Sequence, residues 1–593
     1  MLLFAIASAA VSASAVWHYP QMDLERYRLE HLRDDSRRAC MIAAHPGEVA
    51  PLTGASEFRI RCDGTERVEY AASGFFSERR CDGYLYVRVN GGFRGVGALK
   101  SRSGGWEAKA LDGNWHPTAE YKGTETPPHL VDVAEDRSYA DVVEKDGFYD
   151  CGRELLAYVE CEADADPGLF VGESIPELAE EDRTRLEYSP RMRQVADGCW
   201  RSANALAFRY LRFKRPVKGV KVVPVWRDMV EIGRFDAGNC RYGRMRDVGV
   251  HTLRLCAQDF LLDGIKRDRL PWGGDIAVSL MADAYVYGDA EIARRSLSVL
   301  DAYEGDVNGI VTYSMWTIVA HDMYQLYFGD RKFLEDRWWR IKWRIENLIS
   351  RTDGRGFVVK GLDWVFIDWA TPKSDVAMHA IWKGTLDAAA KLADRVGDKS
   401  AARYRALARK VVDELNAVAW DEHRGIYRAN VENGDVFGRQ ANIYAVVFGV
   451  ADGEKSSRIA DELVKSDLPP VGTPYVYGWE LAVLARTGRA REFFAGIEKM
   501  FGAMLDKGAT SFWEGYSADE KGDAMYSFYR RPWAKSLCHA WSAWPAFIFV
   551  SEAMGVKPTS DGWRTHEVKP LPGAEGMSAT IPTPHGTIEV PKR

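Results

Sequence analysis

A device that joins one helix to the next recurs in the C-terminal half of the chain, and it limits the folds that this half can adopt. An apolar helix end is followed by Gly-Asp and then by a new helix in YVYGDAEIARR, LYFGDRKFLED and DRVGDKSAARY, at Gly288-Asp289, Gly329-Asp330 and Gly397-Asp398. Glycine supplies the left-handed residue that ends a helix, and aspartate caps the following one. LARTGRAREFF is a weaker copy at Gly488. This half of the chain must therefore fold as a series of helix hairpins.

Helical periodicity extends from about 235 to 555. The predicted helices cover 242–262, 276–303, 313–328, 331–350, 375–396, 399–417, 440–450, 455–466, 476–487, 490–506 and 535–554. About six hairpins in succession are typical of a six-hairpin toroid, the (α/α)6 barrel. A superhelical repeat array is the main alternative, but spacings of roughly 40 to 90 residues are too irregular for such an array.

The regions on both sides of this barrel have β character. Alternating or Val/Tyr/Phe-rich segments predict strands at EFRIRC, GYLYVRV, ELLAYVECEA, ALAFRYLRFKR and GVKVVPVWR. We therefore expect one or two β-sandwich domains over 16–234, an (α/α)6 barrel over 235–555, and a short C-terminal β region over 556–593.

Composition narrows the choice of partner. With 593 residues the chain is too long for one core, and a net charge of −6 argues against a nucleic-acid binder. The 20 tryptophans and 26 tyrosines would suit a carbohydrate partner, because indole and phenol faces stack on sugar rings, although a large aromatic core explains them equally well. No apolar run reaches the ~18 residues of a membrane span.

The N-terminus, MLLFAIASAAVSASAVW, has the apolar stretch and the Ala-Ser-Ala site of a signal peptide over 1–15, but it lacks the usual preceding positive charge. We expect an exported protein, periplasmic or extracellular. Nine scattered cysteines without CxxC or zinc-ligand spacing are typical of buried free thiols, with a Cys62–Cys81 disulfide as the alternative for two of them. We predict no cofactor and no metal.

The loop DGIKRDRLPWGGD (263–275) crowds charges among helix breakers. Proline and the glycine pair forbid a continuous helix, so Asp263, Asp268 and Asp275 are presented from irregular backbone. Trp272 would make a rigid sugar platform. Two ordinary explanations compete: Asp275 could simply cap the following helix, and the loop's arginines could form surface ion pairs.

Three further patches combine carboxylates, tryptophans and histidine. In GATSFWEGYS, Glu514 lies beside Trp513, and we expect partial burial to raise its pKa and suit it to proton transfer; an exposed glutamate at a helix start is the alternative. GLDWVFIDWA contains Trp369 beside an aspartate, and KSLCHAWSAWPAF places His539 at the start of the predicted last helix, where a core histidine would be the ordinary explanation.

Carboxylates among aromatic side chains are what glycosidic bond hydrolysis requires, because one acid protonates the leaving oxygen and another carboxylate acts on water or on the sugar carbon. The chain has no GxSxG motif, no phosphate-binding GxxxxGK[ST] motif and no metal-ligand cluster. The residues therefore favour a glycoside hydrolase.

The motifs DGIKRDRLPWGGD, GATSFWEGYS and SLCHAWSAWP resemble those of bacterial α-L-rhamnosidases, glycoside hydrolase family 78, and the similarity covers roughly 145–590. The resemblance implies an (α/α)6 catalytic barrel, flanking β-sandwiches and an inverting mechanism. It implies Asp268 as general acid and Glu514 as general base. The positions that match the family's sugar pocket are Asp263, Arg267, Trp272, Asp275 and Trp369, and His539 matches the histidine near the base. We also expect Trp513, beside Glu514, to bind the substrate.

The chain departs from the family at several points. The general acid is usually glutamate, so the shorter Asp268 requires a closer loop or leaves the role to Asp263 or Asp275. Gly264-Ile265 replaces a frequent Cys-Pro. The substrate could therefore carry rhamnose or a related deoxy or neutral sugar. The alternatives are another (α/α)6 enzyme, such as an unsaturated-uronide hydrolase or a lyase, and a non-catalytic carbohydrate-binding relative. The oligomeric state is left open.

Overall fold

The protein forms two compact units, Met1–Val131 and Asp132–Arg593. The computed structural model describes residues 134–592 except 188, 189, 204, 259, 302, 304, 433 and 466, and within the first 133 residues it describes 16–19, 56–62, 66, 68, 70–71, 76–89, 99–101, 103–109 and 115–121. The expected signal peptide over 1–15 lies outside these residues. Among the helices of the described part, none has the length and apolar character that crossing a membrane requires.

The first unit contains two antiparallel sheets, with strand orders β3-β6-β1-β9 and β4-β5-β2-β7-β8. The strands are β1 (Val16–Tyr19), β2 (Ser56–Arg61), β3 (Tyr70–Ala71), β4 (Phe76–Cys81), β5 (Tyr84–Val89), β6 (Leu99–Ser101), β7 (Glu107–Lys109), β8 (Trp115–Pro117) and β9 (Ala119–Tyr121). Alternate residues of β2 and β5, among them Phe58 and Leu85, are fully buried. The predicted strands at EFRIRC and GYLYVRV are confirmed.

The alternative of a Cys62–Cys81 disulfide is wrong, because both thiols are free. Cys81 ends β4, Cys62 follows β2 and donates its amide to the Gly83 carbonyl of the β4–β5 hairpin, and the Cys62 thiol donates a hydrogen bond to Glu66, at 3.2 Å.

The second unit begins with an antiparallel β-region, residues 134–226. It comprises β10 (Ala134–Glu135), β11 (Val143–Lys145), β12 (Phe148–Glu162), β13 (Leu169–Gly172), the short helix α3 (Ile175–Ala179), β14 (Met192–Ala196), β15 (Cys199–Ser202), β16 (Leu206–Phe213) and β17 (Lys218–Trp226). The long strand β12 pairs with β11, β15, β16 and β17, and a register shift between Asp150 and Leu155 bends it. Three of the predicted strands thus correspond to β12, β16 and β17.

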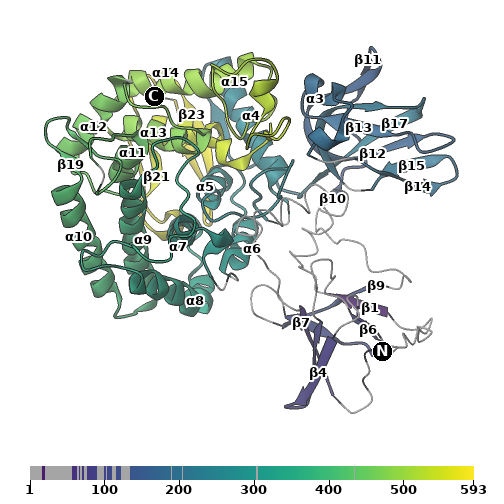
Figure 1. Cartoon of the computed structure of the whole chain (residues 1–593), viewed down its shortest axis with the longest axis horizontal. Coiled ribbons are helices and arrows are strands. Elements are labelled where there is room, and N and C mark those ends of the chain that lie inside the picture. The colour runs from purple at the N-terminus through teal and green to yellow at the C-terminus, as the bar shows by residue number, and fades with distance from the viewer. Residues whose placement is uncertain are drawn as a thin grey trace, which may run out of the picture. The chain divides into compact units, whose positions relative to one another are not determined.

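Helices dominate the rest of the second unit. They are α4 (Cys240–Cys256), α5 (Ile276–Val286), α6 (Ala290–Asp301), α7 (Val311–Phe328), α8 (Arg331–Ser350), α9 (Asp375–Val396), α10 (Ala401–Val418), α11 (Arg439–Val447), α12 (Gly453–Lys465), α13 (Pro474–Arg486), α14 (Ala490–Ile497) and α15 (Ala503–Asp506). The odd-numbered helices from α5 to α13 contact one another in sequence, and the even-numbered helices from α6 to α14 pack outside them (Figure 1). Accordingly α5, α7 and α13 are buried almost all round, whereas α10 and α12 have one buried face.

The Gly-Asp device works as predicted at the end of α7. Gly329 is left-handed, with φ of 66°, and the Asp330 carboxylate accepts a hydrogen bond from the Phe333 amide at 3.0 Å. Gly288 is also left-handed, with φ of 68°, and therefore divides the predicted helix 276–303 into α5 and α6.

The predicted helix 535–554 is wrong. Residues 535–539 are non-helical, and short 3-10 turns at Ala540–Ser542 and Trp544–Ala546 and a π turn at Phe549–Ala553 follow. The amides at its start, among them that of His539, which donates to the Phe512 carbonyl at 2.9 Å, bond to other parts of the chain, and the amides that follow form only short local turns. Its apolar residues are buried all round, and such a run looks helical in sequence without being helical.

The C-terminal residues form β21 (Val556–Pro558), β22 (His566–Val568), β23 (Ser578–Thr583) and β24 (Gly586–Val590). Strand β23 pairs with β18 (Arg234–Asp236), so the C-terminal strands pack against the start of the helical part.

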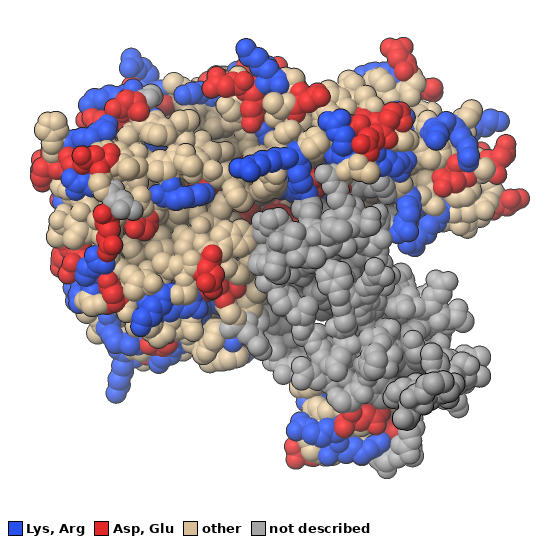
Figure 2. All heavy atoms as spheres, in the orientation of Figure 1, with Lys and Arg blue, Asp and Glu red and all other residues tan. Residues whose placement is uncertain are grey.

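Figure 2 shows basic and acidic side chains interspersed over the visible face of the helical part, without a continuous basic stripe among the residues drawn in colour.

Candidate active site

Three segments that are distant in sequence meet beside α5. They are the loop 257–275 between α4 and α5, the loop 508–517 after α15, and the segment 535–542. Gly264 and His539 form an antiparallel bridge, and the Ala540 amide donates to the Asp263 carbonyl at 2.6 Å. The Glu514 amide donates to the Ser536 carbonyl at 2.9 Å. Backbone hydrogen bonds therefore bring the predicted acid loop, glutamate and histidine together.

The Glu514 carboxylate lies at the centre of this arrangement and is completely buried. Its Oε1 accepts hydrogen bonds from Arg267 Nη2 at 2.5 Å and from the Tyr529 hydroxyl at 2.8 Å. Its Oε2 accepts from the Ser536 amide at 3.0 Å. A carboxylate has about four acceptor positions, so one remains for a further donor such as water.

The predicted direction of the Glu514 pKa is wrong. Burial by itself would raise the pKa, as expected, but the Arg267 charge and the hydrogen bonds outweigh it, so the pKa of Glu514 lies below its ordinary value. Glu514 is therefore a carboxylate at neutral pH. This state suits a base that takes a proton from water.

Tyr529 is a site residue that the sequence analysis missed. Its hydroxyl bonds to Glu514, the Arg267 guanidinium lies 4.7 Å from its ring centroid, and Trp369 packs edge-on against it at 5.1 Å. The Tyr529 backbone is left-handed, with φ of 52°, in a stretch without a recognisable motif. No local signal separates this tyrosine from the other 25 in the chain.

Asp263 and Asp275 are both buried. An Asp263 oxygen accepts from the Leu270 amide at 3.1 Å, which closes the loop on itself. Burial, with the nearby Asp268 and Asp275 adding to it, raises the pKa of Asp263 well above its ordinary value. Burial also raises the pKa of Asp275 to about 8. Asp275 is therefore mostly protonated at neutral pH and can donate a hydrogen bond, and Asp263 holds its proton to higher pH than an ordinary aspartate.

The explanation of Asp275 as a plain helix cap is wrong. The residue stands at the start of α5, but its backbone is helical and its side chain makes no capping hydrogen bond. The carboxyl instead accepts from the Tyr313 hydroxyl at 3.3 Å and lies 4.0 Å from His539 Nδ1. Tyr313, on α7, is a second residue that the sequence analysis missed.

We expect the Asp275→Asn variant to become more stable relative to wild type as pH rises. The folded pKa of about 8 lies above the unfolded value of 3.8, so the wild-type stability tied to this group is lost as pH rises between them. Asparagine does not titrate, and the difference should grow by about 1.4 kcal/mol for each pH unit from 5 to 7. Urea unfolding of both proteins at pH 5, 6 and 7 measures it. Parallel stability curves would show that Asp275 is ionised when folded.

Asp268 differs from its neighbours because its side chain is exposed whereas Arg267 and Arg269 are buried. Its backbone is left-handed, with φ of 35°, and so is that of Arg269, with φ of 52°. Aspartate tolerates this conformation better than most residues. The turn directs Arg267 towards Glu514, and Arg269 donates to the Ile265 and Ala205 carbonyls. The explanation of these arginines as surface ion pairs is therefore wrong.

His539 and Trp272 are buried, and each keeps a polar ring atom without a hydrogen-bond partner within the part of the chain that the structure describes. Burial lowers the pKa of His539 to about 3, so the ring is neutral, and it packs on Trp541 at 4.2 Å. Trp272 packs edge-on against Tyr313 at 6.0 Å. An unpaired buried donor is costly unless a ligand satisfies it.

The two remaining predicted tryptophans lie in different environments. Trp369 is 36 % exposed and packs on Phe366 and Tyr529, so it belongs to the rim of the site. Trp513 is buried and its ring contacts Tyr516, while its carbonyl accepts from the Ser542 hydroxyl at 2.6 Å. Trp513 thus precedes Glu514 in the chain and is held in the core by these two contacts.

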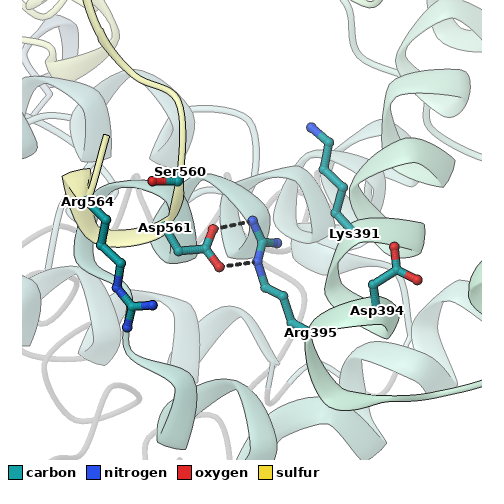
Figure 3. Close-up of a pocket in the computed structure, with 6 residues that line it drawn as sticks. All are labelled: Lys391, Asp394, Arg395, Ser560, Asp561 and Arg564. Carbon is teal, nitrogen blue, oxygen red and sulfur yellow. Dashed lines mark hydrogen bonds and ion pairs between the residues drawn. The ribbon is translucent and has the colours of Figure 1, made fainter. Parts of the chain in front are cut away.

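Among the described residues, no group of three or more His, Cys, Asp or Glu side chains could hold a metal ion. A separate surface pocket of about 400 Å³ lies between α9 and the C-terminal segment (Figure 3). There Arg395 binds both oxygens of Asp561, at 2.7 and 2.6 Å, and also binds Asp322 at 2.5 Å. These ion pairs join α9 to the C-terminal segment, and they occupy the Arg395 guanidinium.

The geometry defines a class of protein. An ionised, arginine-bound glutamate and a loop with three aspartates, two of them buried, meet among aromatic rings on a framework of helix hairpins. This is the machinery of a glycoside hydrolase. The model of the bacterial α-L-rhamnosidase six-hairpin glycosidase domain matches residues 231–550, and the chain belongs to this family. The resemblance noted from the motifs is confirmed.

Solved structures show the same fold. A family 78 rhamnosidase of Bacillus sp. GL1 is 18% identical with a TM-score of 0.63, over 97% of this chain and 70% of that one. A rhamnosidase from Klebsiella oxytoca with rhamnose bound is 21% identical with a TM-score of 0.59, over 85% and 97%. The α-L-rhamnosidase of Streptomyces avermitilis complexed with L-rhamnose is 16% identical with a TM-score of 0.63, over 91% and 66%. A search of curated proteins finds no match.

Proposed function

We propose that this enzyme releases terminal α-L-rhamnose, or a closely related deoxy or neutral sugar, from glycosides or oligosaccharides with inversion at the anomeric carbon. The observation that carries the proposal is the Glu514 carboxylate, buried and ionised beside Arg267, in contact with a loop that offers aspartates in other protonation states. The family to which the chain belongs supports the choice of sugar.

Glu514 acts as the general base. Three of its acceptor positions are occupied by Arg267, Tyr529 and the Ser536 amide, and the fourth receives the attacking water. The proton passes from this water to the carboxylate as the oxygen bonds to the anomeric carbon. Arg267 keeps Glu514 ionised before the reaction and fixes its orientation.

Asp268 acts as the general acid. It is the exposed aspartate of the loop, so it can reach the glycosidic oxygen, which lies where the bound sugar meets its leaving group. Asp263 and Asp275 are buried and bonded to the Leu270 amide and the Tyr313 hydroxyl, which suits them to hold sugar hydroxyls. In an inverting enzyme we expect the Asp268 and Glu514 carboxyls to stand about 6.5–9.5 Å apart, with the water and sugar between them.

The rest of the pocket binds the sugar ring. Trp272 and His539 present unpaired buried ring nitrogens to its hydroxyls, and Trp369 contributes an exposed indole face at the rim. We expect Trp513, buried next to Glu514 in the chain, to help line the pocket.

The proposal includes the arrangement of the domains. The contacts among α5, α7, α9, α11 and α13, each followed by an outer helix, supply five hairpins and support an (α/α)6 toroid over 235–555. We assign the β-region and the first unit to β-sandwich domains within 16–234, and residues 1–15 to a signal peptide that exports the enzyme.

Turnover of aryl α-L-glycosides tests the function. We expect p-nitrophenol release from the rhamnoside to exceed release from the arabinofuranoside and fucoside, and proton NMR of the first product to show the β anomer. If no sugar of the panel is released, hydrolysis fails as the function. If the α anomer appears first, inversion fails while hydrolysis stands.

A further inference from the structure

Lys266 precedes Arg267, and its side chain reaches away from Glu514 into the β-region. Its Nζ lies 2.7 Å from Glu177 Oε1 and 3.3 Å from Glu173 Oε2, and it donates to the Lys535 carbonyl at 3.3 Å. Only 1 % of Lys266 is exposed. Consecutive residues of the site loop thus bind carboxylates on opposite sides.

The two β-region carboxylates are ordered by their own hydrogen bonds. Glu177 stands in the first turn of α3, where Ser174 Oγ accepts from its amide at 3.3 Å, and its Oε2 accepts from the Glu173 amide at 3.0 Å. Glu173 Oε2 also accepts from the Leu537 amide at 2.7 Å. Leu537 lies between Ser536, which binds Glu514, and His539. The same carboxylates therefore contact both segments that surround the general base.

A second connection joins the β-region to the loop that carries Tyr529. The Trp533 indole donates to Glu180 Oε2 at 3.1 Å, and Arg531 pairs with Glu187 at 3.4 Å. Glu180 directly follows α3, and Glu187 lies further along the same stretch of chain. Parts of the β-region near α3 thus touch each segment that binds Glu514.

The charges at this interface compensate one another. Burial by itself would lower the pKa of Lys266, but Glu177 and Glu173 raise it, so the ammonium is charged. Burial raises the pKa of Glu173 to about 7 and raises that of Glu177, while the Lys266 charge and hydrogen bonds act in the opposite direction and keep both shifts smaller than burial alone would make them. Removing one member of such a buried set leaves the others without compensation, and the local structure must move or admit water.

We propose that Glu173 and Glu177 are positioning residues for catalysis: through Lys266 and the Leu537 amide they fix the two segments that bind Glu514, so the β-region is part of the active-site framework. This inference rests on the proposed function only where it concerns turnover. Neither carboxylate touches the reacting atoms, since Lys266 and the Leu537 amide lie between them and Arg267 or Ser536.

The test compares Glu177→Gln and Glu173→Gln with Glu160→Gln. Glu160 also lies in the β-region, but it pairs with Arg137 and Arg201. Hydrogen exchange of the peptides that cover 263–270 and 535–540 is followed by mass spectrometry in the full chain. We expect at least about tenfold faster exchange of these peptides in both test variants and wild-type exchange in Glu160→Gln.

The kinetic readout is the pH profile of the rhamnoside reaction. The groups that face Glu514 are Arg267, Tyr529, the Ser536 amide, His539 and Asp275. In Glu177→Gln and Glu173→Gln we expect the contact between Arg267 and Glu514 to loosen. The acidic limb of their pH profile should then move up by about one pH unit, and kcat should fall about tenfold, with KM within about twofold of the wild-type value.

Each outcome decides something. Exchange and pH profile equal to those of Glu160→Gln would overturn the positioning role, even if the melting temperature falls. If the two test variants show faster local exchange but the wild type hydrolyses no glycoside, the positioning role is kept and the proposed function is rejected. If Glu177→Gln does not fold, the milder Glu177→Asp, which keeps the charge and shortens its reach, is expected to show the same local exchange.

Discussion

Replacing Glu514 by glutamine is expected to lower kcat on the rhamnoside by about 10²–10⁴-fold, the range that general-base catalysis contributes. Glutamine keeps the size of the side chain, but its single carbonyl oxygen can replace only one of the two carboxylate oxygens that accept from Tyr529 and from the Ser536 amide, and it cannot take a proton from water. Because the uncharged amide also leaves Arg267 buried without its counter-ion, some loss of stability should accompany the loss of activity.

Glu480→Gln is the matched control for this variant. Glu480, on α13, is also buried, and its ion-pair partner at 2.7 Å is Arg439 of α11, which belongs to none of the three site segments. We expect it to lower the melting temperature and to leave kcat near the wild-type value. Equal losses of kcat in both variants would mean that Glu514 matters only for folding.

The pH profile gives an independent check on Glu514. Its folded pKa is lowered, so the carboxylate persists below the ordinary range and is lost only as pH falls through that lowered value. The acidic limb of kcat/KM should therefore lie below pH ~4.3, the ordinary pKa of a glutamate. An acidic limb at or above this pH would mean that a group other than Glu514 titrates there.

Asp268→Asn is expected to give a loss that depends on the leaving group. For a methyl or sugar aglycone, whose alkoxide leaves poorly, kcat should fall by about 10²–10⁴-fold. For a dinitrophenyl aglycone, which departs without protonation, the loss should be small, because only the proton donor is removed. Steady-state kinetics on a series of aryl and alkyl rhamnosides measures the slope against leaving-group acidity.

Asp263→Asn and Asp275→Asn are the comparisons for this series. Both aspartates are buried and bound within the pocket, so we expect their replacement to raise KM and lower kcat equally for all leaving groups. A leaving-group dependence in Asp275→Asn, with none in Asp268→Asn, would transfer the acid role to Asp275, whose pKa of about 8 keeps it protonated at neutral pH.

The local signals in the sequence were sufficient for most of the fold. Left-handed glycines such as Gly329 and caps such as Asp330 depend on neighbours within one turn, so the hairpins could be predicted from short segments. The segment 535–554 could not, because the amides at its start bond to residues far away in sequence, and a buried apolar run has no periodicity to distinguish its conformation.

Of the site, the sequence by itself determined which segments carry the chemistry: an aspartate loop that cannot be helical, and a glutamate and a histidine among tryptophans. Only the tertiary structure decided their protonation and their partners. Arg267 meets Glu514 across 247 residues of sequence, and this contact reverses the direction of the pKa shift that burial alone would cause. Tyr529, Tyr313 and Lys266 likewise take their roles from contacts with distant segments. A pKa depends on the charges and solvent around a group in space, and sequence proximity does not specify these.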